Sequence, residues 1–483
     1  MSNPSVVQLK PFLQPFPYGR EGMESWAAQF ALATPSLKAD VDKDGGIKSS
    51  QPYGELWCGG THKNGPCYVE GRDETLKGLI QRDAGFYLGK KLLNDEQMAS
   101  QYPSDLPFLF KILSFDKPLP LQCHPDKGLG KRLFQEEKRR EGENSNFVDT
   151  NAKPEVGVAL SPFTAFVGFR PIEQLAAIVK GVPELQGLFQ ESTLSTLYST
   201  ASSSPSDDQS KAVLRSLFYE AINATPSKFK PLTKRLSDRV AKEGADTVFG
   251  AANAFTPKGK ANASGESEAQ AMARVFDISV KTYGEDDVGS IVALVLMNIL
   301  RLQKGEGAWI LADDLHAYVE GDIIECMVRR LAPAASRSRA HSPLVPSAQA
   351  NSDNMVAHGL GESEMGGIST FVEMLSYRHL PAEQLLLEYE DKWSKGQRGL
   401  TRRYKVPIAE FDLLATTLTS VSESTETLSP LDGPLTFIVT NGSVKVTAGG
   451  DSVSLTKGQC GFVRAEVEIQ LEGNGELWGA FYQ

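Results

Sequence analysis

The C-terminal part of the chain alternates hydrophobic and polar residues in short runs. From Pro434 onward the runs read LTFIVT, SVKVTA, DSVSLT, EVEIQLE and LWGAFYQ, with turn residues between them. A period of two residues is typical of half-buried β-strands. Asn441-Gly442 stands between the first two runs, and Asn-Gly is a strong signal for a two-residue hairpin. The pattern predicts an antiparallel jelly roll of the cupin kind.

A second set of apolar runs predicts another β-region earlier in the chain. It spans PFLFKILSF, PLPLQCH, VGVAL and TAFVGF between residues 106 and 170, and resumes at Gly307–Met327. Residues 172–285 instead carry apolar spacings that fit amphipathic helices, as in AVLRSLFYEAI and LTKRLSDRVA. Two tracts in this part, Ser192–Ser210 and Pro257–Gln270, have the composition of loops or disordered segments.

These patterns predict a mainly β protein with an α insertion, in which a helical domain accompanies two cupin-like jelly-roll barrels. The predicted boundaries are 1–105 for an N-terminal segment that packs on the barrels, 106–171 with 286–380 for a metal-binding cupin, 172–285 for the helical insertion, and 381–483 for the C-terminal jelly roll. A chain of 483 residues is long enough for two or three domains.

Composition narrows the classes of function. The net charge of -10 disfavours nucleic acid as a partner, because phosphate-binding surfaces are normally basic. The longest apolar run, Ser290–Leu300, is shorter than the roughly 20 residues that a membrane span requires. Five scattered cysteines without a CxxC pair are typical of a reducing compartment. We therefore expect a cytoplasmic protein without a nucleic-acid or membrane partner.

Histidine is scarce, which narrows the search for a metal site. The chain has six, His62, His124, His316, His341, His358 and His379. In an extended strand, Gln122 and His124 point to the same face while Cys123 points to the opposite one. With Glu155 and His316 they would place two imidazoles, a carboxylate and an amide oxygen around one ion, a set that suits zinc and does not exclude manganese, iron or nickel. The alternative is that the Gln-x-His pair is structural.

Several blocks of sequence resemble one family. The stretches QCHPDKGLGKRLF, NAKPEVGVALSPFTAFVGFRP and LHAYVEGDIIECM, together with PYGREG, YGELWCGGTH and FVEMLSY, are similar to type I phosphomannose isomerases, the zinc-dependent mannose-6-phosphate isomerases of fungi and animals. The resemblance covers nearly the whole chain. It implies that Gln122, His124, Glu155 and His316 bind one Zn²⁺ per chain.

The resemblance also implies the reaction. An aldose and a ketose phosphate, mannose 6-phosphate and fructose 6-phosphate, would interconvert through an enediolate and supply GDP-mannose synthesis. Two neutral imidazoles, one amide and one carboxylate leave the zinc site a charge of about +1, which favours stabilisation of the enediolate. The acid/base candidates carried over are Lys153, Tyr318, Glu325 and Asp353, and Lys127 and Lys153 are candidates for binding substrate. Glu325 and Asp353 could instead hold loops, and Tyr318 could merely line the pocket.

Three positions depart from the family pattern. Ala357 stands at an arginine position, Ser363 near a lysine position, and Pro120 at a serine position. An arginine that grips phosphate through two hydrogen bonds is worth about 2 kcal/mol or more. Either the protein acts on another sugar, or Lys127, Lys153 and the divergent loop compensate. A non-catalytic sugar-binding cupin protein and an iron-dependent oxygenase are the alternatives from other classes.

Residues 328–349 interrupt the family order. This insertion, VRRLAPAASRSRAHSPLVPSAQ, has four arginines and no acidic residue, and its removal restores ECMANSDN. Its first and last codons fit the ends of an unspliced intron, so we expect an artefact of the gene model, with a basic surface loop as the alternative. His341 within it is not expected to bind metal. Transcripts that mostly retain these codons would exclude the intron.

Overall fold

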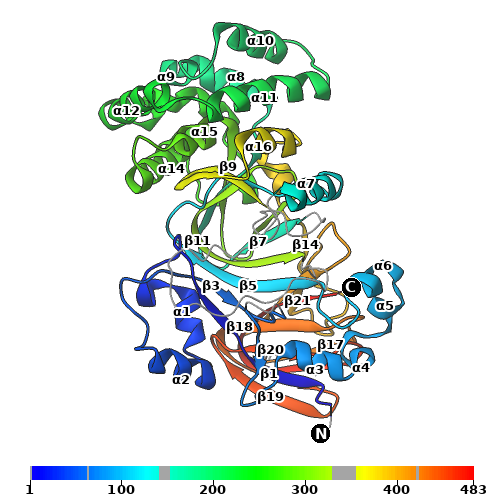
Figure 1. The fold of residues 1–483 in the computed structure, drawn as a ribbon. Coiled ribbons are helices and arrows are strands. Elements are labelled where there is room, and N and C mark those ends of the chain that lie inside the picture. Colours follow the sequence, from blue (N-terminus) through cyan, green and yellow to red (C-terminus); the bar gives the residue numbers. More distant parts are fainter. Residues whose placement is uncertain (1–2, 62–64, 141–152, 329–354, 420–423, 483) are drawn as a thin grey trace.

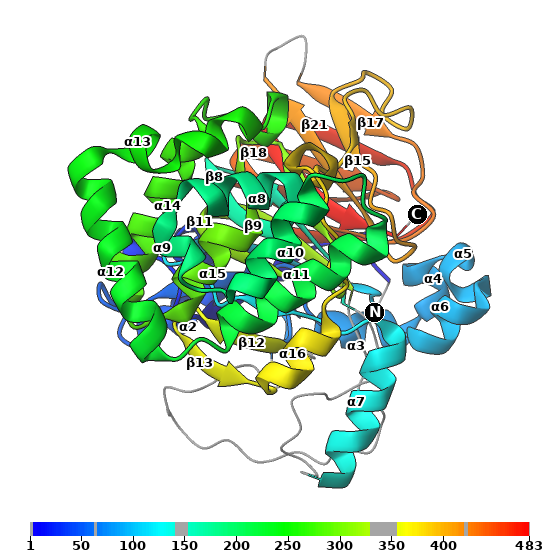
Figure 2. The same cartoon turned by 90° about the horizontal axis from the view of Figure 1, so that it is seen from above.

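The computed structural model describes residues 3–61, 65–140, 153–328, 355–419 and 424–482. Helices lie above an eleven-stranded antiparallel sheet, and a ten-stranded antiparallel sheet lies below it (Figure 1). Seen from above, the helices cover the upper sheet, and α7 (Lys127–Arg140) projects from the side (Figure 2). Among the described residues, every helix is too short or too polar to cross a lipid bilayer.

The N-terminal part contributes strands to both sheets and helices to their sides. Strand β1 pairs with β20 of the lower sheet, whereas β3 pairs with β5 of the upper one. The elements are β1 (Val6–Lys10), β2 (Phe12–Pro15), η1 (Gly22–Glu24), α1 (Trp26–Ala31), α2 (Pro35–Lys43), β3 (Tyr53–Trp57), β4 (Tyr68–Val69), α3 (Leu76–Arg82), α4 (Ala84–Leu88), α5 (Lys90–Asn94) and α6 (Glu96–Gln101).

The upper sheet is organised around one long strand, β11 (His316–Val328). Its first half pairs with β6 and β8, and its second half pairs with β5 and β7. The change of partners occurs at a bulge beside Gly321, whose φ of 136° favours glycine. The other elements here are β5 (Phe108–Phe115), β6 (Gln122–Cys123), β7 (Glu155–Ala159), β8 (Phe163–Phe169), β9 (Met297–Leu302), β10 (Gly307–Ile310), β12 (Val356–Gly359), β13 (Glu362–Met365), α16 (Ile368–Met374) and η5 (Ala382–Leu385).

The stretch of sequence between β8 and β9 is helical, and the apolar faces of these helices share one hydrophobic core with the upper sheet. They are α8 (Ile172–Gly181), α9 (Pro183–Gln186), α10 (Glu191–Ala201), α11 (Asp207–Ile222), α12 (Pro226–Glu243), α13 (Ala245–Phe249), η3 (Gly250–Phe255), η4 (Gly259–Ala261), α14 (Glu268–Tyr283) and α15 (Val288–Leu296).

The expectation that Ser192–Ser210 lacks regular structure was wrong. Most of the tract lies in α10 and in the start of α11. Leu197 is fully buried and anchors α10, and Ser206 forms a capping box with Gln209 at the start of α11. The other predicted loop, Pro257–Gln270, contains the short η4 and the first turn of α14.

The lower sheet contains the alternating hydrophobic and polar runs of the C-terminal part of the chain. Its strands are β14 (Tyr389–Glu390), β15 (Thr401–Tyr404), β16 (Asp412–Leu418), β17 (Thr425–Leu428), β18 (Leu435–Ala448), β19 (Asp451–Thr456), β20 (Cys460–Val463) and β21 (Ile469–Phe481), joined at one edge by β1 and β4. The order along the main path is β14-β15-β16-β21-β18-β20-β1-β4.

The hairpin predicted at Asn441-Gly442 was wrong. Strand β18 continues through both residues, which pair with Glu476 and Gly475 of β21 after a register shift at Val439. The Asn-Gly pair therefore bends a long strand instead of reversing it. The reversal lies seven residues later at Gly449-Gly450, where both φ angles are positive, as the favoured two-residue hairpin turn requires.

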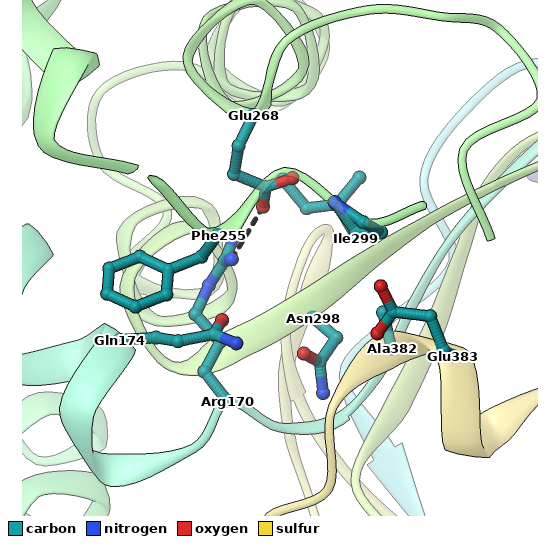
Figure 3. A pocket seen from close by; sticks show the side chains of 9 residues that line it. Arg170, Gln174, Phe255, Glu268, Asn298, Ile299, Ala382 and Glu383 are labelled. Carbon is teal, nitrogen blue, oxygen red and sulfur yellow. Dashed lines mark hydrogen bonds and ion pairs between the residues drawn. The ribbon is translucent and has the colours of Figure 1, made fainter. Parts of the chain in front are cut away.

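A buried ion-pair triad joins the helices to the upper sheet. Glu268, the first residue of α14, accepts hydrogen bonds from Arg170 at 2.5 Å and from Arg301 on β9 at 2.9 Å (Figure 3 shows the first). All three residues are at most 2% exposed. A buried charge without its partner is costly, so the carboxylate holds two guanidinium groups that could not otherwise stay in the core.

We predict that Glu268→Gln lowers the free energy of unfolding by about 2 kcal/mol, because a neutral amide replaces the charge that both arginines need. Chemical denaturation followed by circular dichroism measures the change. The matched control is Glu266→Gln, which removes a partly exposed ion pair with Arg274 and should cost less than about 1 kcal/mol. Equal losses in the two variants would contradict a special role for the triad.

Candidate functional site

Three of the predicted metal ligands converge in the upper sheet. Ligand atoms of His124, Glu155 and His316 all lie within 4.8 Å of one another. Nε2 of His124 is 3.2 Å from Oε1 of Glu155, and Nε2 of His316 is 3.6 Å from Oε2 of the same carboxylate. The three side chains are at most 3% exposed. They are the one group of three or more His, Cys, Asp and Glu residues with metal-binding spacing among the residues that the structure describes.

Strand pairing accounts for the positions of Gln122 and His124 beside His316. Gln122 on β6 lies directly opposite His316 on β11, and directly opposed residues in an antiparallel pair share a face. His124 follows two residues after Gln122, while Cys123 is fully buried in the hydrophobic core, as the alternation predicts. Glu155 is the first residue of β7, immediately after Pro154, and pairs with Met327 at the far end of β11. Gln122 thus lies beside the cluster as its fourth candidate ligand.

The protonation states of the cluster suit a divalent cation. The Nδ1 atom of His316 is 3.0 Å from the carbonyl oxygen of Asp314, which fixes the proton there and leaves Nε2 as the free lone pair. Burial, followed by the Lys153 charge, lowers the pKa of His124, so its imidazole is neutral. Burial raises the pKa of Glu155, but Lys153 and the imidazoles outweigh it and hold that pKa well below its usual value. His124 and Glu155 are therefore in the forms that bind metal.

The burial of the cluster also fits a cation. Nε2 of His316 belongs to a fully buried ring, and among the described residues it has no hydrogen-bond partner. Buried polar nitrogens normally have a partner. A cation coordinated by nitrogen and oxygen atoms fits this space and these donors.

A second group of charges lies farther along the same face. Nζ of Lys111 on β5 is 2.8 Å from Oε2 of Glu325 and 3.3 Å from Oε1 of Glu55. Trp57 donates an indole hydrogen bond of 2.6 Å to the other oxygen of Glu55. Lys111 pairs with Glu325 on one side and with Trp57 on the other, so these side chains share the sheet face of Glu155.

The candidate acid/base residues differ in their titration. Burial raises the pKa of Glu325 to about 7, with Glu155 and Glu55 adding to the effect and Lys111 opposing it. Burial, together with Glu325 and Glu155, raises the pKa of Tyr318 well above its ordinary value, so its phenol stays protonated. Lys153 lies 3.1 Å from Oε1 of Glu155 and stays close to the cluster. A carboxyl group with a pKa near 7 can accept and return a proton near neutral pH, so Glu325 has the titration that an acid/base residue requires.

The remaining predicted positions are placed only in part. Asp353, His62 and His341 lie outside the described residues. Lys127 is the first residue of α7, and its side chain is not described. Ala357 on β12 is fully buried and directly opposite Gln122. The position next to the His124–Glu155–His316 cluster therefore carries only a methyl group. Val328 ends β11, whereas the rest of the inserted segment is outside the described residues.

Sequence reasoning missed Lys111, Glu55 and Trp57. One signal was available for the lysine. It is the single charged residue in the strand FLFKILSF, and a lysine in a buried apolar strand requires a carboxylate partner. Glu55 and Trp57 lie in the family-like stretch YGELWCGGTH, but nothing in that stretch places them opposite Lys111.

Comparisons with known proteins agree with this site. Residues 6–172 match the model of the phosphomannose isomerase type I catalytic domain. Mannose-6-phosphate isomerase of Saccharomyces cerevisiae is 29% identical over 100% of this chain and 98% of its own length, and that of Aspergillus fumigatus is 30% identical over 98% and 94%.

Solved structures show the same fold. A phosphomannose isomerase variant from Salmonella typhimurium superimposes with a TM-score of 0.72 at 19% identity. The match covers 99% of this chain and 100% of the Salmonella chain. A zinc-bound mannose 6-phosphate isomerase has a TM-score of 0.70 at 20% identity, with the same coverage. Because a 30% identical relative is matched over nearly its whole length, the chain belongs to the type I phosphomannose isomerase family.

Proposed function

We propose that this protein is a zinc-dependent isomerase that interconverts mannose 6-phosphate and fructose 6-phosphate. The observation that carries the proposal is the buried cluster of His124, Glu155 and His316 on the same sheet face as the Lys111–Glu325 pair. Gln122, His124, Glu155 and His316 would hold one Zn²⁺. Family membership supports the reaction, which would supply mannose for GDP-mannose synthesis.

The bound ion would supply Lewis-acid stabilisation of negative charge on substrate oxygens. Glu325 would take the proton from the carbon beside the carbonyl and return it to the neighbouring carbon, with an enediolate between the two transfers. Lys111 holds the Glu325 carboxylate in place. The protonated Tyr318 hydroxyl can donate a hydrogen bond to a substrate oxygen, and Lys153 adds positive charge for an anionic substrate.

The test is an isomerase assay of the purified protein with mannose 6-phosphate, fructose 6-phosphate and unphosphorylated mannose side by side, before and after metal removal. We expect turnover of both phosphates, loss on chelation and recovery with Zn²⁺. Turnover of mannose alone would favour a divergent paralogue despite the family match, and binding without turnover would favour a non-catalytic sugar-binding protein. Bound iron and oxygen consumption would favour an oxygenase.

The amide ligand offers a sharper test of the charge argument. We predict that Gln122→Glu retains Zn²⁺ but lowers kcat roughly tenfold to a hundredfold, because a second carboxylate removes the residual positive charge and weakens stabilisation of the enediolate. Metal content by mass spectrometry and kcat measure the two effects. Cys123→Ser, on the opposite face of the same strand, is the control. Unchanged kcat with bound zinc would contradict the charge argument.

We further propose the architecture behind the site. The two sheets, each organised around long bent strands, would form two cupin-like jelly-roll barrels, with boundaries at 1–105, 106–171 with 286–380, 172–285 and 381–483. Five free, buried cysteines support a cytosolic location.

Residues 328–349 separate His316 from Asp353 along the chain. The isomerase assay should therefore compare the full chain with one in which Met327 is joined to Ala350.

A further inference from the structure

A separate cavity lies at the end of the upper sheet away from the metal cluster. Its volume is about 700 Å³, within the range of small-molecule sites. Its walls come from the segment around Trp26, the start of β8, the Arg274 face of α14, and β11 at Glu320–Asp322. Glu320 is four residues from His316 along β11, a separation of roughly 13 Å.

Aromatic side chains separate this cavity from the metal cluster. The rings of Phe115, Phe163 and Tyr318 pack together with centroid distances of 5.4 to 6.1 Å. Phe163 lines the cavity, whereas Tyr318 lies two residues from His316. All three are at most 2% exposed and belong to one hydrophobic cluster, which extends from Phe163 at the cavity to Tyr318 near His316.

The polar groups of the cavity are held in fixed positions. Arg274 donates to both oxygens of Glu266, at 2.8 and 3.0 Å, and also contacts Glu320. Asp322 accepts hydrogen bonds from the hydroxyls of Ser114 and Ser161, at 2.5 and 2.9 Å. Preorganised groups lose little entropy when a ligand binds. The wall of the cavity therefore presents planar carboxylates and guanidinium groups, together with Trp26 and the exposed Gln303.

The charge of the walls selects against anions. Four carboxylates, of Glu24, Glu266, Glu320 and Asp322, line the cavity against three arginines, Arg20, Arg274 and Arg301, of which Arg301 is already paired with the buried Glu268. A sugar phosphate with a charge near -2 would meet a slightly negative surface. A neutral ligand with many hydroxyl groups meets paired donors and acceptors and an aromatic ring instead.

We propose that this cavity is a second, non-catalytic site that binds a neutral hexose saccharide. Carboxylate and guanidinium edges can accept and donate paired hydrogen bonds to neighbouring hydroxyls, and the apolar surfaces of Trp26, Phe163 and Leu302 can contact the apolar face of the sugar ring. The site is independent of the proposed isomerase reaction, since it shares neither the metal ligands nor Glu325.

The test uses methyl α-mannoside and methyl α-glucoside, whose blocked anomeric carbons prevent isomerisation. Saturation-transfer NMR titrations are run on the metal-loaded full chain, on the chain after chelation, and with excess mannose 6-phosphate. We expect saturable millimolar binding of at least one glycoside, unchanged by chelation and by the phosphate. Absence of saturation, loss on chelation or displacement by mannose 6-phosphate would overturn the proposal.

Variants place the binding in the cavity. Glu320→Ala and Gln303→Ala change exposed or half-exposed side chains on its wall, and we expect either to weaken binding at least about fivefold. Asp277→Ala changes an exposed residue of α14 that does not line the cavity and should leave binding unchanged. Thermal unfolding checks that each variant is folded. Wild-type affinity in both wall variants would overturn the assignment.

Discussion

Replacing His316 by alanine is expected to remove both the bound metal and the activity. The fully buried imidazole supplies one of the convergent ligand atoms found among the described residues, and the methyl group of alanine cannot coordinate a cation. If Lewis-acid stabilisation contributes about 4 kcal/mol to the transition state, its loss lowers kcat about a thousandfold. Zinc content by mass spectrometry and kcat with mannose 6-phosphate measure the two losses.

His379→Ala is the matched control for this prediction. Its Nδ1 atom is also close to the carbonyl oxygen two residues earlier, at 3.1 Å from that of Tyr377, but His379 lies outside the metal cluster. It should keep one zinc per chain and at least half of the activity. If His316→Ala were folded, bound zinc at one per chain and kept more than a tenth of wild-type kcat, the proposed metal centre would be wrong.

Part of the candidate metal site was predictable because strand geometry carries local information. Alternation along β6 separates Gln122 and His124 from Cys123, and the structure places the cysteine in the core as expected. The proline before Glu155 correctly marks the start of β7. The residues alone left the Gln-x-His pair ambiguous, however, and the resemblance to a family was needed to join β6, β7 and β11 into one site.

The Lys111 group was not predictable, because it depends on which strands are neighbours. Glu55, Lys111 and Glu325 come from β3, β5 and β11, and only the order of the sheet makes them contacts. A buried lysine indicates a carboxylate partner but does not identify it. The Asn441-Gly442 error has a similar origin. The local hairpin preference is real, but pairing of β18 with β21 along its whole length outweighs it.

Glu325→Gln is expected to lower kcat by a factor of about 10² to 10⁴, the usual contribution of a positioned acid/base. The amide keeps the shape of the side chain but cannot carry a proton between the two carbons. Unfolding should not explain the loss. Because the pKa of Glu325 is raised in the folded chain, its ionised carboxylate destabilises the fold at pH values above the ordinary pKa of a glutamate. A neutral amide avoids this cost. The thermal midpoint should therefore stay the same or rise.

The pH profile separates catalysis by Glu325 from a structural role. If its carboxylate is the base, kcat/KM of the wild type falls as pH falls through its pKa, which is about 7 without a cation and lower when one is bound nearby. Glu325→Gln should lose this acidic limb. Glu55→Gln should keep the acidic limb and shift it to lower pH. Lys111 then forms an ion pair with Glu325 alone, which lowers the pKa of Glu325. An acidic limb that persists unchanged in Glu325→Gln would assign the proton transfer to another residue.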